Sequence, residues 1–417
     1  MSRSVTALLV AVFTSSSAHA VGAVAVGKQV FDITGHALDL GLLGLAEFLP
    51  VVLLVVFAGH LADRHDRRMV AIGGLGLEAV AAVGLLAYVA SEPTSVGPIF
   101  VLVVVLGTGR AIGAPAARSL PADIVVAERL PWLVPRYSAC WQAAAIGGPV
   151  LAGFLYADDP ALPYVAMLVL LGVAACALAF VEPLRRADAS SGAAGDAADD
   201  GGGLHDAFEG LRFIRREPIL LGAIGLDLFA VLFGGVVGLL PAIATERLGV
   251  DAVGLGWLRA AGGLGAAGVT LALAARPITR HVGHRLLVTV ALFGAATVVL
   301  GVTGNFAVAL LAMLVLSGAD AVSVFIRATL VPLVTPERMR GRVFAVENVF
   351  IGGSNQAGDF ESGIAGQVLG VGPAVVAGGV ATLLVAGLWW FAFPALRSLD
   401  RFPTVPRAVP AATPAAP

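Results

Sequence analysis

Long apolar stretches separated by short polar breaks follow one another along almost the whole chain. A helix needs about 20 apolar residues to cross the hydrocarbon core of a bilayer. Twelve stretches approach or reach that length, so the pattern predicts an all-α membrane protein with twelve transmembrane helices. The predicted spans are 5–26, 38–61, 69–90, 98–119, 134–156, 162–182, 218–241, 253–275, 285–303, 306–328, 343–369 and 372–395.

Composition excludes the main alternative, a soluble globular protein. Of the 417 residues, 58% are hydrophobic and 13% are charged, whereas about a quarter of the residues in a soluble domain are charged. Most of the surface must therefore contact the lipid bilayer. The formal net charge of −2 gives no reason to expect a nucleic-acid partner.

The distribution of arginines predicts the orientation of the chain. Cytoplasmic loops collect Lys and Arg, and with the N-terminus inside, 22 of the 26 basic residues lie on or face the cytoplasmic side. Only Lys28 and Arg247 fall outside, while Arg110 and Arg259 lie within spans. We therefore expect a multi-pass protein of the inner or plasma membrane with both termini in the cytoplasm.

The order of segments predicts two halves joined by a linker. Residues 187–203 are rich in Gly, Ala and Asp without apolar periodicity, which is typical of a flexible linker, and an amphipathic helical pattern follows them. We expect an N-terminal six-helix bundle at 1–183, a cytoplasmic linker with an interfacial amphipathic helix at 184–217, a C-terminal six-helix bundle at 218–397 and a disordered cytoplasmic tail at 398–417.

A weak internal repeat fits this division, because parallel repeats are common in secondary transporters. At a constant offset of 209, one triplet of charged residues recurs in the second half: Arg118, Glu128 and Arg129 match Arg327, Glu337 and Arg338.

The loop after the second span, residues 59–68, has the sequence GHLADRHDRR. It resembles the signature loop of the major facilitator superfamily, G-x-L-A-D-R-x-G-R-R, with Asp66 where Gly is usual. The resemblance implies two pseudo-symmetric six-helix bundles that work by alternating access. An acid and several arginines at this edge can pair across a closing interface, and the alternative is a loop that only sets the topology. The predicted gating residues are Gly59, Asp63, Arg64, Arg67, Arg68, Arg118 and Asp123.

The fifth span contains a second motif, GGPVLAG at residues 147–153. It resembles the G-P-x-x-G-G motif associated with exporters in that superfamily, with Ala152 in place of one glycine, and the alternative is an ordinary kinked helix. The predicted motif residues are Gly148, Pro149 and Gly153. Residues 42–50, 115–118 and 354–363 also resemble the enterobactin-exporter-like branch, which implies export of siderophores, drugs or related amphipathic compounds.

Ionisable residues inside spans are the main candidates for a transport site, because each is costly in lipid and tends to face a cavity or a partner. The span at 343–369 carries three acids and several amides. A carboxylate in a partly dry cavity has its charged form disfavoured, so it can load and release a proton. The predicted proton-coupling residues are Asp359 and Glu361, with Asp227 in reserve. The alternative for any single acid is a structural pair, as we expect for Asp320 with Arg327.

Polar residues that accompany these acids form the predicted substrate site. They are Asn348, Asn355, Gln356, Glu47, Arg110 and Gln142. No cofactor, metal or nucleotide is expected. The stretch 22–29 nearly fits a phosphate-binding loop but ends in Gln29 where Ser or Thr is required. His281 and His284 have no further ligands nearby, and both cysteines, Cys140 and Cys176, lie in apolar runs and are expected to be small buried residues.

These features predict a secondary active transporter and no enzymatic activity, since no nucleophile with a neighbouring base is present. We expect alternating-access export of an amphipathic small molecule, a siderophore or a drug, by proton antiport. Two alternatives remain. One is a proton-coupled nutrient importer, and the other is a membrane sensor or assembly protein that does not transport.

Overall fold

The computed structural model describes residues 3–91, 94–182 and 204–403, and every regular element in these ranges is a helix. The twelve long helices are α1 (Arg3–Thr34), α2 (Ala37–Arg64), α3 (Arg67–Val89), α4 (Gly97–Ile124), α5 (Leu130–Asp158), α6 (Leu162–Ala179), α8 (Pro218–Gly234), α10 (Ala252–Ala275), α11 (Val282–Val302), α12 (Phe306–Val334), α13 (Arg340–Leu369) and α14 (Val371–Ala392). The shorter elements are α7 (Leu204–Arg216), α9 (Leu240–Ala242), α15 (Pro394–Arg397), η1 (Ala127–Arg129), η2 (Ile243–Arg247) and η3 (Glu337–Met339).

Each of the twelve predicted spans coincides with one of the long helices. Ten of them are long and apolar enough to cross a membrane, and α7 with α8 makes an eleventh if this pair, bent by 107°, is counted as one. The twelfth, α13, is 30 residues long but is rich in polar side chains. The span predicted at 218–241 is shorter than expected, since α8 ends at Gly234 and residues 235–239 leave the helix.

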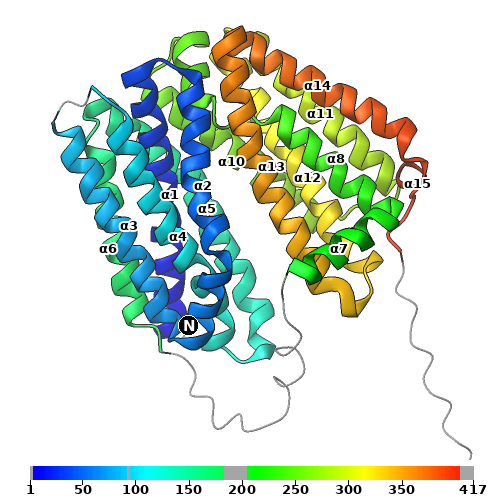
Figure 1. Ribbon diagram of the computed structural model, residues 1–417, viewed down its shortest axis with the longest axis horizontal. Coiled ribbons are helices and arrows are strands. Elements are labelled where there is room, and N and C mark those ends of the chain that lie inside the picture. Colours follow the sequence, from blue (N-terminus) through cyan, green and yellow to red (C-terminus); the bar gives the residue numbers. More distant parts are fainter. Residues whose placement is uncertain (1–2, 92–93, 183–203, 404–417) are drawn as a thin grey trace, which may run out of the picture.

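The helices form two groups that follow the chain (Figure 1). In the first group α1 packs on α5 and α6, α3 packs on α4 and α6, and α2 packs on α4. In the second group α11 packs on α12 and α14, α8 packs on α13 and α14, and α10 packs on α12. The two groups meet mainly where α2 packs on α13 and α5 packs on α10.

The predicted internal repeat extends to the secondary structure. The order α4, η1, α5 recurs as α12, η3, α13, and α4 starts at Gly97 while α12 starts at Phe306, an offset of 209 residues. The environments of the matched arginines differ: Arg118 is exposed, whereas Arg327 is only 4% exposed. Arg327 therefore does not lie at a solvent-facing helix end as the sequence suggested.

The two groups approach most closely at the face opposite the N-terminus, which lies at the bottom of Figure 1. We call this opposite side the far face. A Cβ atom added to Gly41, early in α2, would lie 2.9 Å from the carbonyl oxygen of Asp359 on α13. One added to Gly153, late in α5, would lie 2.5 Å from the carbonyl oxygen of Ala252 at the start of α10. Glycine at these positions lets the helices meet at the far face.

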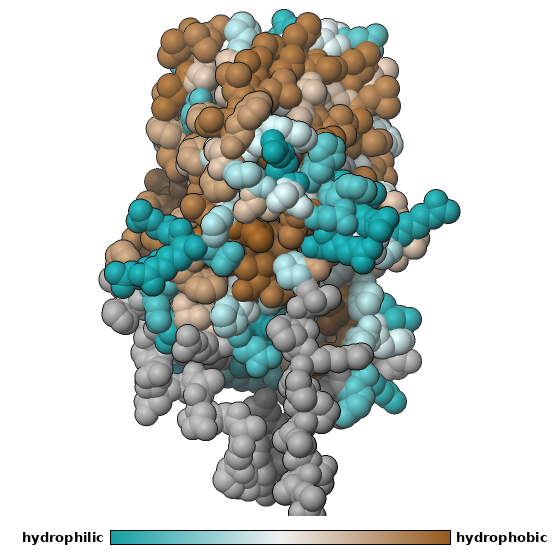
Figure 2. Space-filling view, turned by 90° about the vertical axis from the view of Figure 1, so that its right-hand side faces the viewer, coloured by the Kyte–Doolittle hydropathy of each residue, from teal (hydrophilic) through white to brown (hydrophobic). Residues whose placement is uncertain are grey.

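The outer surface has the polarity of a membrane protein. Figure 2 shows apolar side chains over the upper part of one side, with hydrophilic side chains gathered lower down. Exposed arginines lie at the helix ends nearest the N-terminal face, among them Arg285, Arg397 and Arg401. This arrangement places an apolar band against lipid and the charged groups at its edge.

The amphipathic segment forms the helix α7, which packs against α13 and α8. Ile214 is 1% exposed and joins the apolar cluster at the foot of these helices, whereas Phe208 is 66% exposed. The linker residues 183–203 and the tail residues 404–417 lie outside the described ranges.

One expectation about buried residues was wrong. Cys176 is exposed and Cys140 is half-buried, and both carry free thiols. In a membrane an apolar stretch faces lipid as readily as the protein interior, so apolar neighbours do not imply burial.

Candidate functional site

A central cavity of about 160 Å³ lies between the two groups of helices. Its apolar walls come from α1, α2 and α4 on one side and from the segment after α8 on the other, and include Val26, Leu40, Leu106 and Val237. Its polar lining consists of Glu47, Arg110, Arg259, Gln356 and Asp359. Four ionisable side chains thus surround one small space at the interface of the two groups.

Glu47 and Arg110 form an ion pair in the wall of this cavity. Glu47 lies on α2 and Arg110 on α4, and an Arg110 Nη1 atom donates a hydrogen bond to Glu47 Oε1. The Arg110 Nε atom is buried and has no hydrogen-bond partner among the described residues. The pair neutralises two charges in the first half of the chain and leaves one guanidinium donor unused.

Gln356 and Asp359 enter the cavity from α13. They are three residues apart, so they share one face of this helix. Asp359 Oδ1 accepts a hydrogen bond from the Gly238 N–H at 3.1 Å. This contact depends on the early end of α8, which is followed by a turn at residues 237–239 that reaches the cavity wall. Gln356 Oε1 is buried with no hydrogen-bond partner among the described residues.

Arg259, on α10, is the ionisable cavity residue that was not among the predicted substrate or proton-coupling residues. The available signal was an arginine in the middle of an apolar span, where a charge is costly unless it serves a purpose. The span at 253–275 was predicted, but the direction in which the Arg259 side chain points depends on how α10 is rotated against its neighbours.

The remaining predicted substrate residues do not line the cavity. Asn348 and Asn355 are exposed, and Asn355 Nδ2 donates to the Ile351 carbonyl on its own helix at 2.8 Å. Gln142 Nε2 donates to the Gly263 carbonyl at 3.0 Å, which joins α5 to α10. Glu361 is half-buried and is not part of the cavity lining. Successive helical residues differ by about 100°, so only one stripe of α13 can face the cavity.

A second ionisable cluster lies within the second group of helices. Arg327 Nη2 on α12 is 2.8 Å from Asp227 Oδ1 on α8, and Arg327 Nη1 is 3.8 Å from Glu347 Oε1 on α13. Ser323 Oγ donates to Asp227 at 3.4 Å. This corrects the expected pair of Arg327 with Asp320. These two residues are seven positions apart, or about 10 Å along the helix, while Asp227 faces Arg327 from the neighbouring helix.

A third pair lies in the first group, and its acid is buried. His19 Nε2 on α1 lies 2.7 Å from Glu78 Oε2 on α3, and Glu78 is 2% exposed. His19 is therefore the partner of a buried acid. Among the described residues there is no group of three or more His, Cys, Asp or Glu that could hold a metal ion.

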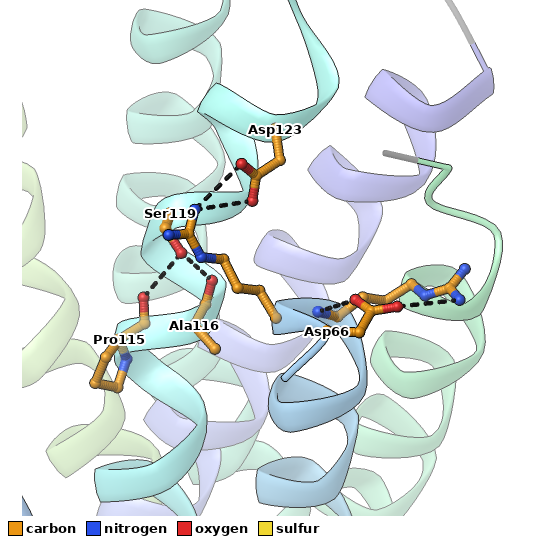
Figure 3. A network of polar contacts seen from close by, with 7 residues as sticks. Asp66, Pro115, Ala116, Ser119 and Asp123 are labelled. Atoms are coloured by element: carbon orange, nitrogen blue, oxygen red, sulfur yellow. Dashed lines mark hydrogen bonds and ion pairs between the residues drawn. The ribbon is translucent and has the colours of Figure 1, made fainter. Parts of the chain in front are cut away.

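The signature loop is anchored within the first group (Figure 3). Asp66 caps α3, because its Oδ1 accepts the Arg68 N–H at 2.9 Å, and its backbone has a negative φ of −58°. Arg67 Nη1 donates to both carboxylate oxygens of Asp123 at 3.1 Å. Arg68 Nη1 donates to the Val181 carbonyl at 3.0 Å after α6. Asp66, which stands where glycine is usual, therefore does not require a left-handed backbone conformation. Its side chain also caps the N-terminus of α3.

The other predicted gating residues are not part of this network as described. Arg64 and Arg118 are exposed. Gly59 and Asp63 belong to α2, but the surroundings of Gly59 and the side chain of Asp63 lie outside the described part of the structure.

The motif in α5 lies where this helix meets two others. A Cβ atom on Gly148 would lie 2.6 Å from Ala20 Cβ on α1. One on Gly256 of α10 would lie 2.5 Å from the Pro149 carbonyl oxygen. The small residues and the proline therefore let α5 pack closely against α1 and against α10, next to the central cavity.

The chain matches known membrane transporters along most of its length. Residues 5–357 match the family model of the Major Facilitator Superfamily. The chain is 27% identical over 412 residues to the multidrug efflux pump Tap of Mycolicibacterium fortuitum, covering 94% of this chain and 96% of that protein.

Solved structures show the same fold. A bacterial homologue of the human lysosomal transporter Spinster, inward-facing and unoccupied, aligns with a TM-score of 0.72 at 15% identity, over 96% of this chain and 98% of that chain. A bacterial homologue of the iron transporter ferroportin, inward-facing, aligns with a TM-score of 0.67 at 16% identity, over 95% and 100%. With two six-helix bundles around a central cavity and a family match over most of its length, the chain belongs to the Major Facilitator Superfamily of membrane transporters.

Proposed function

We propose that this protein exports an amphipathic small molecule, a drug or a siderophore, by proton antiport with alternating access. The observation that carries the proposal is the central cavity, where apolar walls surround Glu47, Arg110, Arg259 and Asp359. Such a site suits a ligand with an apolar body and a few polar groups. The relationship to a multidrug efflux pump supports export as the direction. The resemblance to the enterobactin-exporter-like branch motivates including siderophores among the candidates.

In this proposal the bundles 1–183 and 218–397 rock against each other around the cavity. Contacts of α2 with α13 and of α5 with α10 hold the far face together. If the arginine-rich ends are cytoplasmic, the far face is external and the protein is closed to the outside. The signature loop, with Asp63, Arg67, Arg68 and Asp123, would latch the cytoplasmic side in the opposite state.

Asp359 is the proposed proton carrier. It lines the cavity, and its Oδ1 atom accepts a hydrogen bond from the Gly238 N–H. Asp227 is less suited, because it is engaged with the buried Arg327, and Glu361 does not line the cavity. Antiport requires an acid that the cargo and the proton can occupy in turn, and a cavity-facing position allows this.

The test is efflux of a panel of drugs and siderophores from cells with and without the protein, each with and without a protonophore. Export that depends on both the protein and the proton gradient is expected for some compounds. Protein-dependent accumulation inside the cells would favour the importer. Absence of any flux, also from vesicles loaded with the same panel, would favour a sensor or assembly protein.

A further inference from the structure

Arg259 is the one charged cavity residue whose hydrogen-bonding groups are not engaged among the described residues. Its Nε atom is buried and has no hydrogen-bond partner there. No carboxylate of those residues lies within the 4.0 Å of an ion pair from its guanidinium. By contrast, Arg110 in the same cavity is held by Glu47.

Asp359 lines the same cavity and attracts Arg259 electrostatically, but no ion pair joins the two side chains. Asp359 itself is positioned by the Gly238 N–H at 3.1 Å. The two charges therefore stand apart on α10 and α13, with the cavity accessible to both.

Charge balance restricts which ligand can bind between Arg259 and Asp359. The four ionisable cavity residues carry two positive and two negative charges when all are ionised. An anion alone would neutralise Arg259 but would bring a like charge towards Asp359, and a cation alone would do the reverse. Charges withdrawn from bulk water are costly unless they are paired. A ligand with one acidic and one basic group satisfies both residues at once.

Geometry adds the roles of the two groups. A guanidinium presents its N–H donors in a rigid fork that matches a carboxylate in a bidentate contact. Asp359 offers carboxylate oxygens that an ammonium group can donate to. Val26, Leu40 and Leu106 supply apolar walls for the part of the ligand between its charges.

We propose that Arg259 and Asp359 form a paired subsite for a zwitterion: the acidic group of the cargo binds Arg259 and its amine binds Asp359. The proposal rests on the transport function above and names its substrate class. It also explains antiport, because the amine and the proton compete for the same carboxylate. An acidic cargo without an amine would bind better when Asp359 is protonated, which would couple the two in the same direction.

The test is a binding series on the purified protein in detergent, with ligand-induced thermal stabilisation and titration calorimetry as readouts. The probes are 4-(aminomethyl)benzoate, 4-methylbenzoate and 4-methylbenzylamine, which share one ring and carry both charges, the acid alone or the amine alone. We expect the zwitterion to bind at least about tenfold more tightly than either analogue, since each charged contact contributes about 1.5–3 kcal/mol. Sodium chloride at the same concentration is expected to give no stabilisation.

Variants assign the two contacts. Arg259→Gln should remove the advantage of the zwitterion over 4-methylbenzylamine, and Asp359→Asn its advantage over 4-methylbenzoate. Arg259→Lys should restore part of the lost affinity. Arg285→Gln, the same change at an exposed position, is the matched control and should leave all three affinities unchanged.

The zwitterion subsite is overturned if the three probes bind equally, if none binds, or if the preference for the zwitterion over 4-methylbenzylamine survives in Arg259→Gln. Stabilisation by chloride equal to that by the zwitterion would also overturn it, in favour of a general anion site. The binding series needs no gradient, so these outcomes are independent of the efflux test. A protein that binds the zwitterion but shows no flux would refute the transport proposal alone.

Discussion

Asp359 is the residue whose charge the proposed coupling depends on. Asp359→Asn keeps an oxygen that can accept the Gly238 N–H but cannot release a proton. We expect efflux driven by a pH gradient to fall to background, while exchange of cargo down its own gradient continues. Both fluxes can be measured in vesicles with a cargo identified from the panel.

Glu361→Gln is the matched control for this substitution. It makes the same chemical change two residues away on α13, outside the cavity lining. Gradient-driven efflux should persist in this variant. If Asp359→Asn also concentrates cargo normally, Asp359 does not carry the proton, and loss in Glu361→Gln alone would transfer the assignment to Glu361.

Asp227 has a structural role that a second substitution can test. Asp227→Asn would leave the buried Arg327 with Glu347 at 3.8 Å as its remaining ion-pair partner among the described residues. Removing one partner of a buried pair costs about 3–5 kcal/mol, so we expect a clearly lower melting temperature in detergent. Asp320→Asn is the control, because Asp320 makes no ion pair within the described residues and should melt near the wild type. Equal melting of both variants would contradict the structural role.

Residue partners were the least predictable feature from sequence. That Asp227, Asp320, Arg327 and Glu347 are ionisable groups inside spans was evident, but their pairing depends on which helices are neighbours. The position of Arg259 in the cavity depends in the same way on the rotation of α10. Apolar patterns constrain that rotation weakly in a membrane, because lipid-facing and buried positions are both hydrophobic.

At the scale of elements, the close contact of α5 with α10 should limit transport. Gly153→Val would place a Cβ atom 2.5 Å from the Ala252 carbonyl oxygen, so the far face cannot close as it does now. Overpacking costs about 1–3 kcal/mol, which corresponds to about tenfold or more in the closing equilibrium at the middle of that range. We expect a similar loss in efflux rate.

Gly147→Val controls for the effect of valine in the same helix. Nothing lies within 4 Å of a Cβ atom at Gly147, so this variant should transport normally. Equal efflux by the two variants at matched expression would show that the α5–α10 contact does not limit the cycle.

The signature loop gives a second prediction at this scale. If Asp63 is part of the cytoplasmic latch, Asp63→Asn should abolish turnover but leave expression and membrane insertion intact. Asp66→Asn is the control, since asparagine caps a helix as well as aspartate does and α3 should keep its start. Normal efflux by Asp63→Asn, measured beside the control, would leave the loop with a topological role only.

Elements themselves were predicted closely, and the reason is physical. A span needs enough apolar residues to cross the bilayer, so its position is visible in the sequence, as for 306–328 within α12 (Phe306–Val334). The helices extend beyond the ends of the predicted spans because they continue past the apolar core of the bilayer into the interface. The early end of α8 at Gly234 was missed, since residues 235–239 remain apolar while leaving the helix.

At the scale of the whole molecule, orientation is the property on which the transport direction depends. The far face is closed by packing of α2 on α13 and of α5 on α10. Whether this describes a state open to the cytoplasm or to the outside follows only from which face is cytoplasmic. The arginine asymmetry predicts that the N-terminal face is cytoplasmic.

Cysteine accessibility tests that assignment. In a protein with Cys140 and Cys176 replaced by alanine, a single cysteine at Ser95, between α3 and α4, should react with an impermeant thiol reagent added to intact cells. A single cysteine at Ser191, in the linker between the bundles, should react only after the membrane is permeabilised, because an even number of spans returns the chain to the side of the N-terminus. The reverse pattern would invert the protein in the membrane, and the closed far face would then be cytoplasmic. Labelling of both cysteines from outside would mean that the number of spans between residues 95 and 191 is even instead of odd, which the succession of α4, α5 and α6 does not allow.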